Sequence, residues 1–224
     1  MNEAALAWRH AFKLDPDRAI SDEALERLCL SGSDGIIVGG SSGVTYENTA
    51  DLLARVRRYE IPIALEASAI EAIVPGFDAY LIPMVLNTNN AEWIIGQHLR
   101  ALRRYSQLLP WDKIIVEGYI ILNPDSTAAR VTEAYMPEME ADVLALAELA
   151  DRLLRLPILY IEYSGSYGDI TLVQRIRDSL TQARLLYGGG IDSGVRAEDA
   201  RQAADTIIVG NVIYRDLDAA LQTV

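Results

Sequence analysis

The chain has 224 residues, of which 32 are acidic and 20 are basic, so its formal net charge at pH 7 is -12. This balance argues against a nucleic-acid-binding protein, which needs a basic face to neutralise phosphates. A small-molecule phosphate remains a compatible ligand, because a few local donors are enough to hold one phosphate group.

Eight short apolar runs predict strands, and the segments between them have the spacing of amphipathic helices. We expect strands at residues 10–14, 35–39, 61–66, 79–86, 114–122, 157–163, 184–188 and 206–210. Helices are expected at residues 50–59, 91–108, 141–154 and 172–183, among others. Strand and helix alternating eight times favour a single (β/α)₈ TIM barrel over residues 1–224.

The third crossover is too short for a full helix with its two loops. Only residues 67–78 (ASAIEAIVPGFD) separate the third and fourth strands, and they include Pro75 and Gly76. We therefore expect a shortened or missing third helix. Two interpretations stay open: a compact crossover with one helical turn, or a gap in the outer ring that takes an elongated apolar ligand.

Small and glycine-rich turns follow several strands at their carboxyl ends, where barrels of this type place their active sites. They lie at residues 160–165 (YIEYSG), 188–190 (GGG) and 210–211 (GN). Glycine lets backbone N–H groups approach an anion closely, and the helix that follows adds its positive dipole end. These turns predict a phosphate site.

The first strand carries Lys13 and Asp15, which the period of two places on the same side. The two side chains could form an internal ion pair. They could equally be a phosphate ligand and a Mg²⁺ ligand, because Mg²⁺ bound to a diphosphate takes one or two protein carboxylates and several waters.

Several motifs in this order and spacing resemble the geranylgeranylglyceryl/heptaprenylglyceryl phosphate synthase family, and its bacterial PcrB branch in particular. They are FKLDP, DGIIVGGSSGVT, EASAIEAIVPGFDAYLIPMVLNTNNAEWIIGQH, EGYIILNPDSTAARVTEA, YIEYSG, YGGGI and IIVGNVIY. The resemblance covers essentially the whole chain. It implies Mg²⁺-dependent transfer of a polyprenyl group from a polyprenyl diphosphate to the 3-hydroxyl of sn-glycerol 1-phosphate by a homodimer.

The resemblance also assigns roles to residues. Lys13 would contact glycerol phosphate, and Asp15 and Ser41 would lie at the Mg²⁺ site. The glycerol phosphate pocket would consist of Tyr160, Ile161, Glu162, Tyr163, Ser164, Gly165, Gly190, Gly210 and Asn211. Within it, Glu162 is the candidate to hold the glycerol hydroxyls and to accept a proton.

The prenyl tail is expected to run along the gap at the third crossover, beside the helix at residues 91–108, with Trp93 as a wall residue. In this family, a bulky aromatic residue on that helix resembles a stop for a twenty-carbon tail. The matching position in this chain is Ala101, which would leave the groove open. We therefore expect a thirty-five-carbon heptaprenyl donor, with a geranylgeranyl donor as the alternative. Two other functions stay open: a phosphate-binding isomerase or aldolase barrel, and a non-catalytic polyprenyl-phosphate-binding module.

The cellular location is expected to be the cytoplasm. Cys29 is the single cysteine, the first ten residues lack the regions of a signal peptide, and no apolar run approaches the roughly 20 residues of a membrane span. The arginine clusters RVRRYE and RALRRY are expected to be solvated helix faces that could also touch anionic lipid at the membrane surface.

Overall fold

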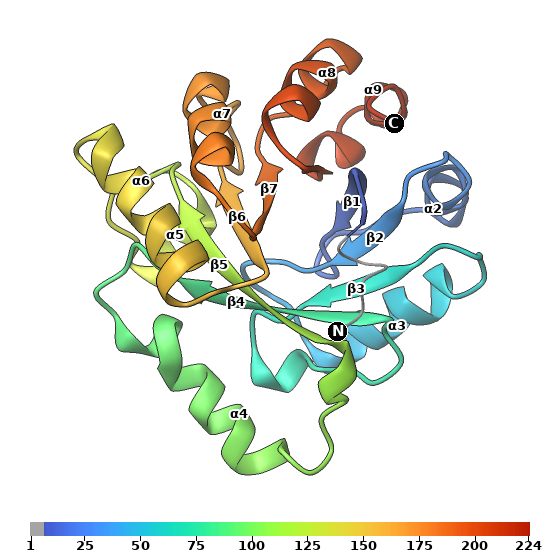
Figure 1. The fold of residues 1–224 in the computed structure, drawn as a ribbon. Coiled ribbons are helices and arrows are strands. Elements are labelled where there is room, and N and C mark those ends of the chain that lie inside the picture. Colours follow the sequence, from blue (N-terminus) through green and yellow to red (C-terminus); the bar gives the residue numbers. More distant parts are fainter. Residues whose placement is uncertain (1–6) are drawn as a thin grey trace.

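The computed structural model describes residues 7–224, and residues 1–6 of the expected single domain lie outside them (Figure 1). Eight parallel strands close into a barrel in chain order. They are β1 (His10–Leu14), β2 (Gly35–Val38), β3 (Ile63–Glu66), β4 (Ala79–Val85), β5 (Ile114–Ile121), β6 (Ile158–Glu162), β7 (Arg184–Gly188) and β8 (Thr206–Val209). The predicted TIM barrel is confirmed, and each strand begins and ends within two residues of its predicted bounds.

Two separate apolar clusters bury the strands on both faces. Alternate residues such as Ala11, Ile37 and Ile208 fill the barrel interior. Their neighbours, such as Phe12 and Ile36, pack outward against the helices. This division follows from the strand period of two, and it explains why the strand sequences are continuously apolar.

The helices surround the barrel. They are α2 (Asp22–Cys29), α3 (Tyr46–Val56), α4 (Gln97–Tyr105), α5 (Thr127–Thr132), α6 (Glu140–Glu148), α7 (Ile170–Ser179), α8 (Gly194–Ala203) and α9 (Leu217–Leu221). Capping side chains explain two differences from the predicted bounds: Thr45 starts α3 at Tyr46, and Asp169 starts α7 at Ile170. No helix within residues 7–224 is long and apolar enough to cross a membrane.

The predicted helices at residues 91–108 and 141–154 each contain one wider turn. A π-helical turn, Glu92–Gly96, leads into α4, and another, Leu149–Leu153, extends α6. α7 ends four residues before its predicted limit, because the backbone N–H groups of residues 181–183 donate to the Asp151 carboxylate instead of continuing the helix.

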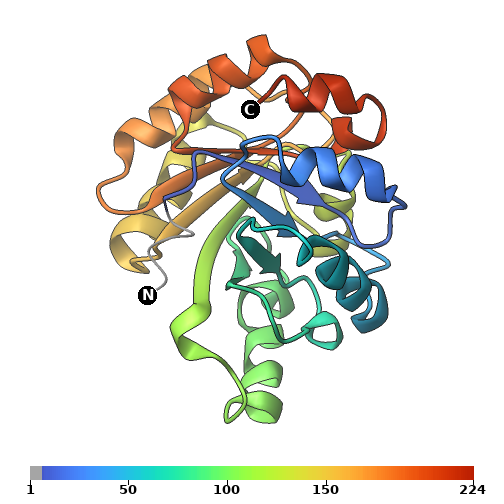
Figure 2. The ribbon, with the colours of Figure 1, turned by 90° about the vertical axis from the view of Figure 1, so that its right-hand side faces the viewer.

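The third crossover contains only one 3₁₀ turn, Ile70–Ala72, so the predicted shortening is confirmed. α4, the next helix along the chain, has no buried residue and projects from the barrel in both views (Figures 1 and 2). The outer ring is therefore incomplete beside β3 and β4.

Candidate active site

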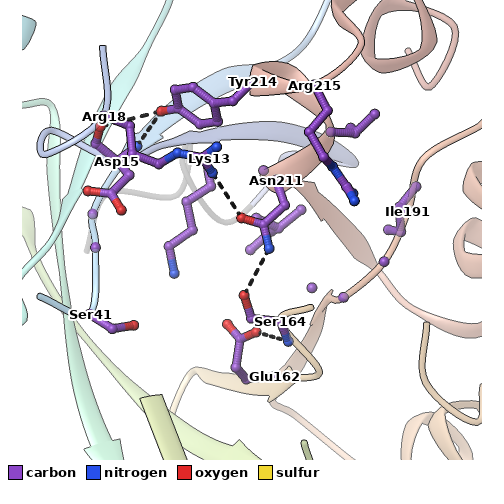
Figure 3. Close-up of a pocket in the computed structure, with 18 of the residues that line it drawn as sticks. Lys13, Asp15, Arg18, Ser41, Glu162, Ser164, Ile191, Asn211, Tyr214 and Arg215 are labelled. Carbon is purple, nitrogen blue, oxygen red and sulfur yellow. Dashed lines mark hydrogen bonds between the residues drawn. The ribbon is translucent and has the colours of Figure 1, made fainter. Parts of the chain in front are cut away.

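A polar pocket of about 110 Å³ lies at the carboxyl ends of β1, β2, β6, β7 and β8 (Figure 3). Nine of the residues expected from the sequence line it: Lys13, Asp15, Ser41, Tyr160, Glu162, Ser164, Gly190, Gly210 and Asn211. Closure of the barrel brings the first, second and last three strands together, which places residues about 200 positions apart in sequence around one cavity.

Three residues of the expected pocket do not line it. Ile161 points outward into the core between strands and helices, because it follows the inward-facing Tyr160 by one residue. Tyr163 also packs in that outer core, with its ring centroid 6.2 Å from that of Tyr187. Gly165 has a φ of +95° and occupies the turn beside Asn123. These three residues therefore lie beside the pocket and do not line it.

Lys13 forms an ion pair with a residue that the sequence analysis did not select. Its Nζ donates to both carboxylate oxygens of Glu66, at 2.7 and 2.9 Å, rather than to Asp15. Burial alone would lower the pKa of Lys13, but the carboxylates of Glu66 and Glu162 outweigh burial and raise it. Lys13 is therefore a fixed cation at the pocket floor.

A stacked pair of tyrosines lies beneath this cation. The Tyr119 and Tyr160 rings are 4.6 Å apart, and the Lys13 Nζ lies 5.4 Å from the Tyr160 centroid. The Tyr119 hydroxyl donates to Glu162 Oε2 at 2.8 Å, and the Ser164 N–H donates to the other carboxylate oxygen. Burial raises the pKa of Glu162, although Lys13 and the Tyr119 hydrogen bond act in the opposite direction.

Glu117 lies fully buried on β5 near this cluster. Within residues 7–224, neither of its carboxylate oxygens has a hydrogen-bond partner. Burial, followed by the charge of Glu66, raises its pKa well above the usual range. Burial thus favours the protonated form of Glu117 in the barrel interior. This residue was not selected from the sequence, because the charges around it come from other strands.

The oxygen donors around Asp15 can be compared with the ligands that the Mg²⁺ ion implied by the family resemblance would need. Asp15 Oδ1 accepts the Asp17 N–H at 3.0 Å, and a Cβ at Gly40 would approach the same oxygen to 2.5 Å, so glycine leaves this carboxylate open. Ser41 faces the same space (Figure 3). Within the described part of the chain, no three acidic, histidine or cysteine side chains form a metal site. The donors therefore fit an ion that takes most of its ligands from a bound diphosphate and water.

The glycine turn after β7 forms one wall of the pocket. Gly190 has a φ of +56°, and a Cβ there would collide with the backbone of Tyr167, so both the conformation and the space require glycine. Opposite this turn, Arg215 extends from the segment after β8 towards Ile191 (Figure 3). Backbone N–H groups and a guanidinium together suit a phosphate.

Among the lining residues that were missed in the sequence, three have long polar side chains: Arg18, Tyr214 and Arg215. The Tyr214 hydroxyl accepts the Asp15 N–H at 2.8 Å, and its ring lies 3.7 Å from the Arg18 guanidinium carbon. Arg18 Nη1 also donates to Asn211 Oδ1 at 3.2 Å. The sequence did offer a signal for the two arginines, because each lies within six residues of the carboxyl end of β1 or β8.

An apolar groove occupies the gap at the third crossover. Its upper cavity, beside the carboxyl end of β3, is lined by Ala67, Trp93 and Ala101. A larger cavity of about 480 Å³ continues towards the other end of the barrel and includes Tyr105. Both cavities share Ile70, Ile73 and Ile82. Trp93 and Ala101 thus line the groove where the sequence placed them.

Comparison with known proteins gives a consistent result. A family model described as the PcrB family matches residues 3–224. Heptaprenylglyceryl phosphate synthases from Bacillus thuringiensis (strain Al Hakam) and Bacillus anthracis (strain A0248) are each 52% identical over 217 residues, covering 97% of this chain and 95% of theirs.

Among solved structures, (S)-3-O-geranylgeranylglyceryl phosphate synthase from Thermoplasma acidophilum, in complex with its substrate sn-glycerol-1-phosphate, is similar with a TM-score of 0.84. It is 23% identical, and the match covers 99% of this chain and 94% of that one. At this identity the likeness shows a shared fold.

Proposed function

The chain belongs to the PcrB family, and from this membership we propose that it transfers a polyprenyl group from a polyprenyl diphosphate to the 3-hydroxyl of sn-glycerol 1-phosphate. The observation that carries the proposal is a junction of two unlike sites. A polar pocket with a cationic floor and a glycine-rich wall includes Gly39 at the end of β2, and Gly39 packs against Glu66 of the neighbouring β3. The apolar groove begins at Ala67, the residue after Glu66. An acceptor with a phosphate and a donor with a long apolar tail would meet where these sites adjoin.

The acceptor is positioned by the last three strands. Its phosphate would lie against the turn at Gly190 and the start of the segment after Gly210, with Arg215 supplying the opposing charge. Lys13 and Glu162 would bind the glycerol part at the floor. Fixing the 3-hydroxyl in this way removes the entropic cost of a bimolecular encounter.

The donor diphosphate would lie between β1 and β2. Asp15 and Ser41 are the residues that would hold Mg²⁺ there. When bound, the ion would neutralise charge on the leaving diphosphate. The overall negative charge of the chain does not prevent this arrangement, because binding depends on local donors and a carboxylate-recruited cation.

The transfer step forms a bond between the glycerol 3-oxygen and the allylic C1, and it breaks the bond from C1 to the diphosphate oxygen. The hydroxyl proton must go to a base, and we assign this role to Glu162, a carboxylate that lines the pocket floor. Its raised pKa supports this role, because a base works best when its pKa is close to the operating pH.

Replacement of Glu162 tests the base assignment. Glu162→Gln keeps the shape and removes the proton acceptor, so kcat should fall by roughly 100-fold or more, while the KM for glycerol 1-phosphate changes less. Steady-state kinetics at saturating donor measure both values. Turnover equal to that of the unmodified enzyme would rule out Glu162 as the base.

The groove supports the thirty-five-carbon donor over the twenty-carbon alternative. Ala101 lies in the upper cavity, and Tyr105, one helical turn further, lines the lower one. The two cavities share Ile70, Ile73 and Ile82, and a small residue on this side of α4 leaves room for a tail to continue from one cavity to the other.

The direct test of the function is a prenyl-transfer assay with radiolabelled glycerol 1-phosphate and a choice of donor. Lipid-extractable product should form with the heptaprenyl donor, should depend on Mg²⁺, and should fall when sn-glycerol 3-phosphate replaces the acceptor. Absence of product with either donor would contradict the enzymatic proposal and leave the polyprenyl-phosphate-binding module. A preference for the geranylgeranyl donor would overturn the chain-length assignment alone.

The isomerase or aldolase alternative is weakened by the state of Lys13. A Schiff-base lysine must lose its proton, whereas two bonds to Glu66 and a raised pKa keep this amine charged. Homodimer formation and a cytoplasmic location with peripheral membrane contact complete the proposal.

A further inference from the structure

Helix α4 and the π-helical turn before it, Glu92–Gly96, expose an apolar stripe that no described part of the chain covers. Ile95, Leu99 and Leu102 recur at helical spacing and are 52%, 57% and 38% exposed. Trp111 lies at the end of this stripe, where its indole N–H donates to the Ser106 carbonyl at 3.2 Å. Trp111 is itself 58% exposed.

Arginines lie beside this stripe. Arg100, Arg103 and Arg104 line a shallow surface hollow between α4 and the 3₁₀ turn of the third crossover. Arg100 pairs with Glu92, but within residues 7–224 neither Arg103 nor Arg104 has a carboxylate partner. Glu71 also lines this hollow, so the three arginines, counted against Glu71 and Glu92, leave a local excess of one positive charge on a chain whose net charge is -12.

We propose that α4 and Trp111 form a docking surface for an anionic lipid bilayer. A helix with leucine and isoleucine on one side, arginine on another and tryptophan at its end has the pattern of helices that lie in the membrane–water interface. The apolar stripe would enter the headgroup region, and the arginines would contact lipid phosphates.

A second copy of this chain fits the same surface less well. In a two-fold symmetric dimer that buried this stripe across the axis, each patch would meet itself. Arg103 and Arg104 would then lie near the same arginines of the other copy, and like charges in a desolvated interface are unfavourable. An anionic bilayer supplies the complementary charge.

The docking surface lies next to the apolar groove, so docking would also serve donor binding. This part of the inference rests on the proposed function. The opposite side of α4 lines the apolar groove through Trp93, which precedes the helix, and Ala101. Docking would therefore place the groove beside the membrane, where a polyprenyl donor is dissolved. The tail could enter the groove without passing through water.

Vesicle sedimentation of the full chain tests the docking surface without any substrate. The chain should bind vesicles of phosphatidylcholine and phosphatidylglycerol more tightly than vesicles of phosphatidylcholine alone, and added salt should weaken the difference. Leu99→Ser/Leu102→Ser and Arg103→Glu/Arg104→Glu should each lower the partition coefficient by about 10-fold or more. Matched controls are Leu30→Ser/Leu153→Ser and Arg9→Glu/Arg152→Glu, which change exposed residues elsewhere and should bind as the unmodified chain does.

Three outcomes would overturn the docking proposal: no preference for anionic vesicles, equal losses in the control variants, or unchanged vesicle binding combined with an altered oligomeric state of the α4 variants in light scattering. The last result would assign the stripe to contact between copies.

Prenyl transfer with the donor in detergent separates this proposal from the enzymatic one. The leucine variant should keep its activity there, whereas inactivity of the unmodified chain would contradict the function and leave the vesicle result intact.

Discussion

Lys13 combines a structural role with the binding role that we propose for it, in one buried side chain. Its ammonium group is held by Glu66 and lies over the Tyr160 ring, yet it still lines the pocket. Breaking a buried ion pair from one side leaves the other charge unpaired, which is costly. The two roles can therefore be separated by changing the partners one at a time.

Lys13→Met should lower the free energy of unfolding by about 3 kcal/mol and raise the KM for glycerol phosphate. The double variant Lys13→Met/Glu66→Gln should recover much of the stability, because no buried charge is left unpaired, but it should not recover acceptor affinity. Urea unfolding and acceptor kinetics measure the two effects. Restored affinity in the double variant would show that Lys13 acts only through folding.

Glu117 allows the effect of a buried ionisable group on the free energy of unfolding to be measured. Folding raises its pKa above the unfolded value of 4.5, so the folded state binds the proton more tightly. Its contribution is most favourable below pH 4.5 and is lost as the pH rises towards the folded pKa. At neutral pH this residue therefore reduces stability relative to a neutral isostere.

Glu117→Gln should be more stable than the unmodified chain at pH 8, and the difference should shrink towards pH 4.5. Urea midpoints across this range measure it, with Glu148→Gln on the exterior of the ring as a control whose midpoint should change little. A difference that stayed constant with pH would mean that Glu117 does not bind a proton on folding.

At the scale of elements, the third crossover and α4 form one unit. Replacing a helix by the turn Ile70–Ala72 leaves apolar strand residues such as Ile82 lining a cavity. α4 reaches over this cavity to β4, where His98 Nε2 lies 3.1 Å from the Pro83 carbonyl oxygen. The space between is the groove. We expect the side chains of α4 that line the groove, such as Ala101, to control how long a tail it accepts.

Ala101→Trp should close the passage between the upper and lower cavities. Transfer of the heptaprenyl group should fall by about 10-fold or more, while the shorter geranylgeranyl group should be affected less, because its tail needs less of the lower cavity. Kinetics with both donors in detergent measure the ratio. Leu102→Trp, on the exposed side of the same helix, is the control, and an equal effect of both variants would indicate general damage to α4.

At the scale of the whole molecule, the first strand is tied to the carboxyl-terminal end of the chain. His10 on β1 forms hydrogen bonds with Ser33 Oγ at 2.9 Å and with Thr223 Oγ1 at 3.1 Å. Burial, followed by the charge of Arg201, lowers the pKa of His10 from 6.5 to about 4. The folded protein therefore holds this histidine neutral over a range in which the unfolded chain binds a proton.

Stability should accordingly fall as the pH drops from 6.5 to 4, because the unfolded state takes up the proton first. The shift corresponds to a loss of about 3 kcal/mol at and below pH 4 from this residue. Urea unfolding of His10→Gln and of His98→Asn, which changes the only other histidine, measures the contribution. The first variant should flatten the pH dependence in this range, and equal slopes in both variants would contradict the assignment.

Much of this molecule was predictable because its signals are local. Continuous apolar runs predicted all eight strands, and the short third crossover predicted the missing helix. Glycine turns and the position of Lys13 predicted residues of the pocket, since the carboxyl ends of parallel strands share one end of a barrel. Helix bounds were less accurate where capping by Thr45 and Asp169 decided the first turn.

The sequence by itself determined the barrel, the family and the place of the polar pocket, because strand period, crossover length and glycine turns depend on neighbouring residues. Only the tertiary structure decided that Lys13 pairs with Glu66, that Tyr119 holds Glu162, and that Ile161 and Tyr163 face away from the pocket. These facts depend on how the strands are aligned when the barrel closes. Closure brings together charges from strands far apart in the sequence, and their mutual burial sets the charge of the site.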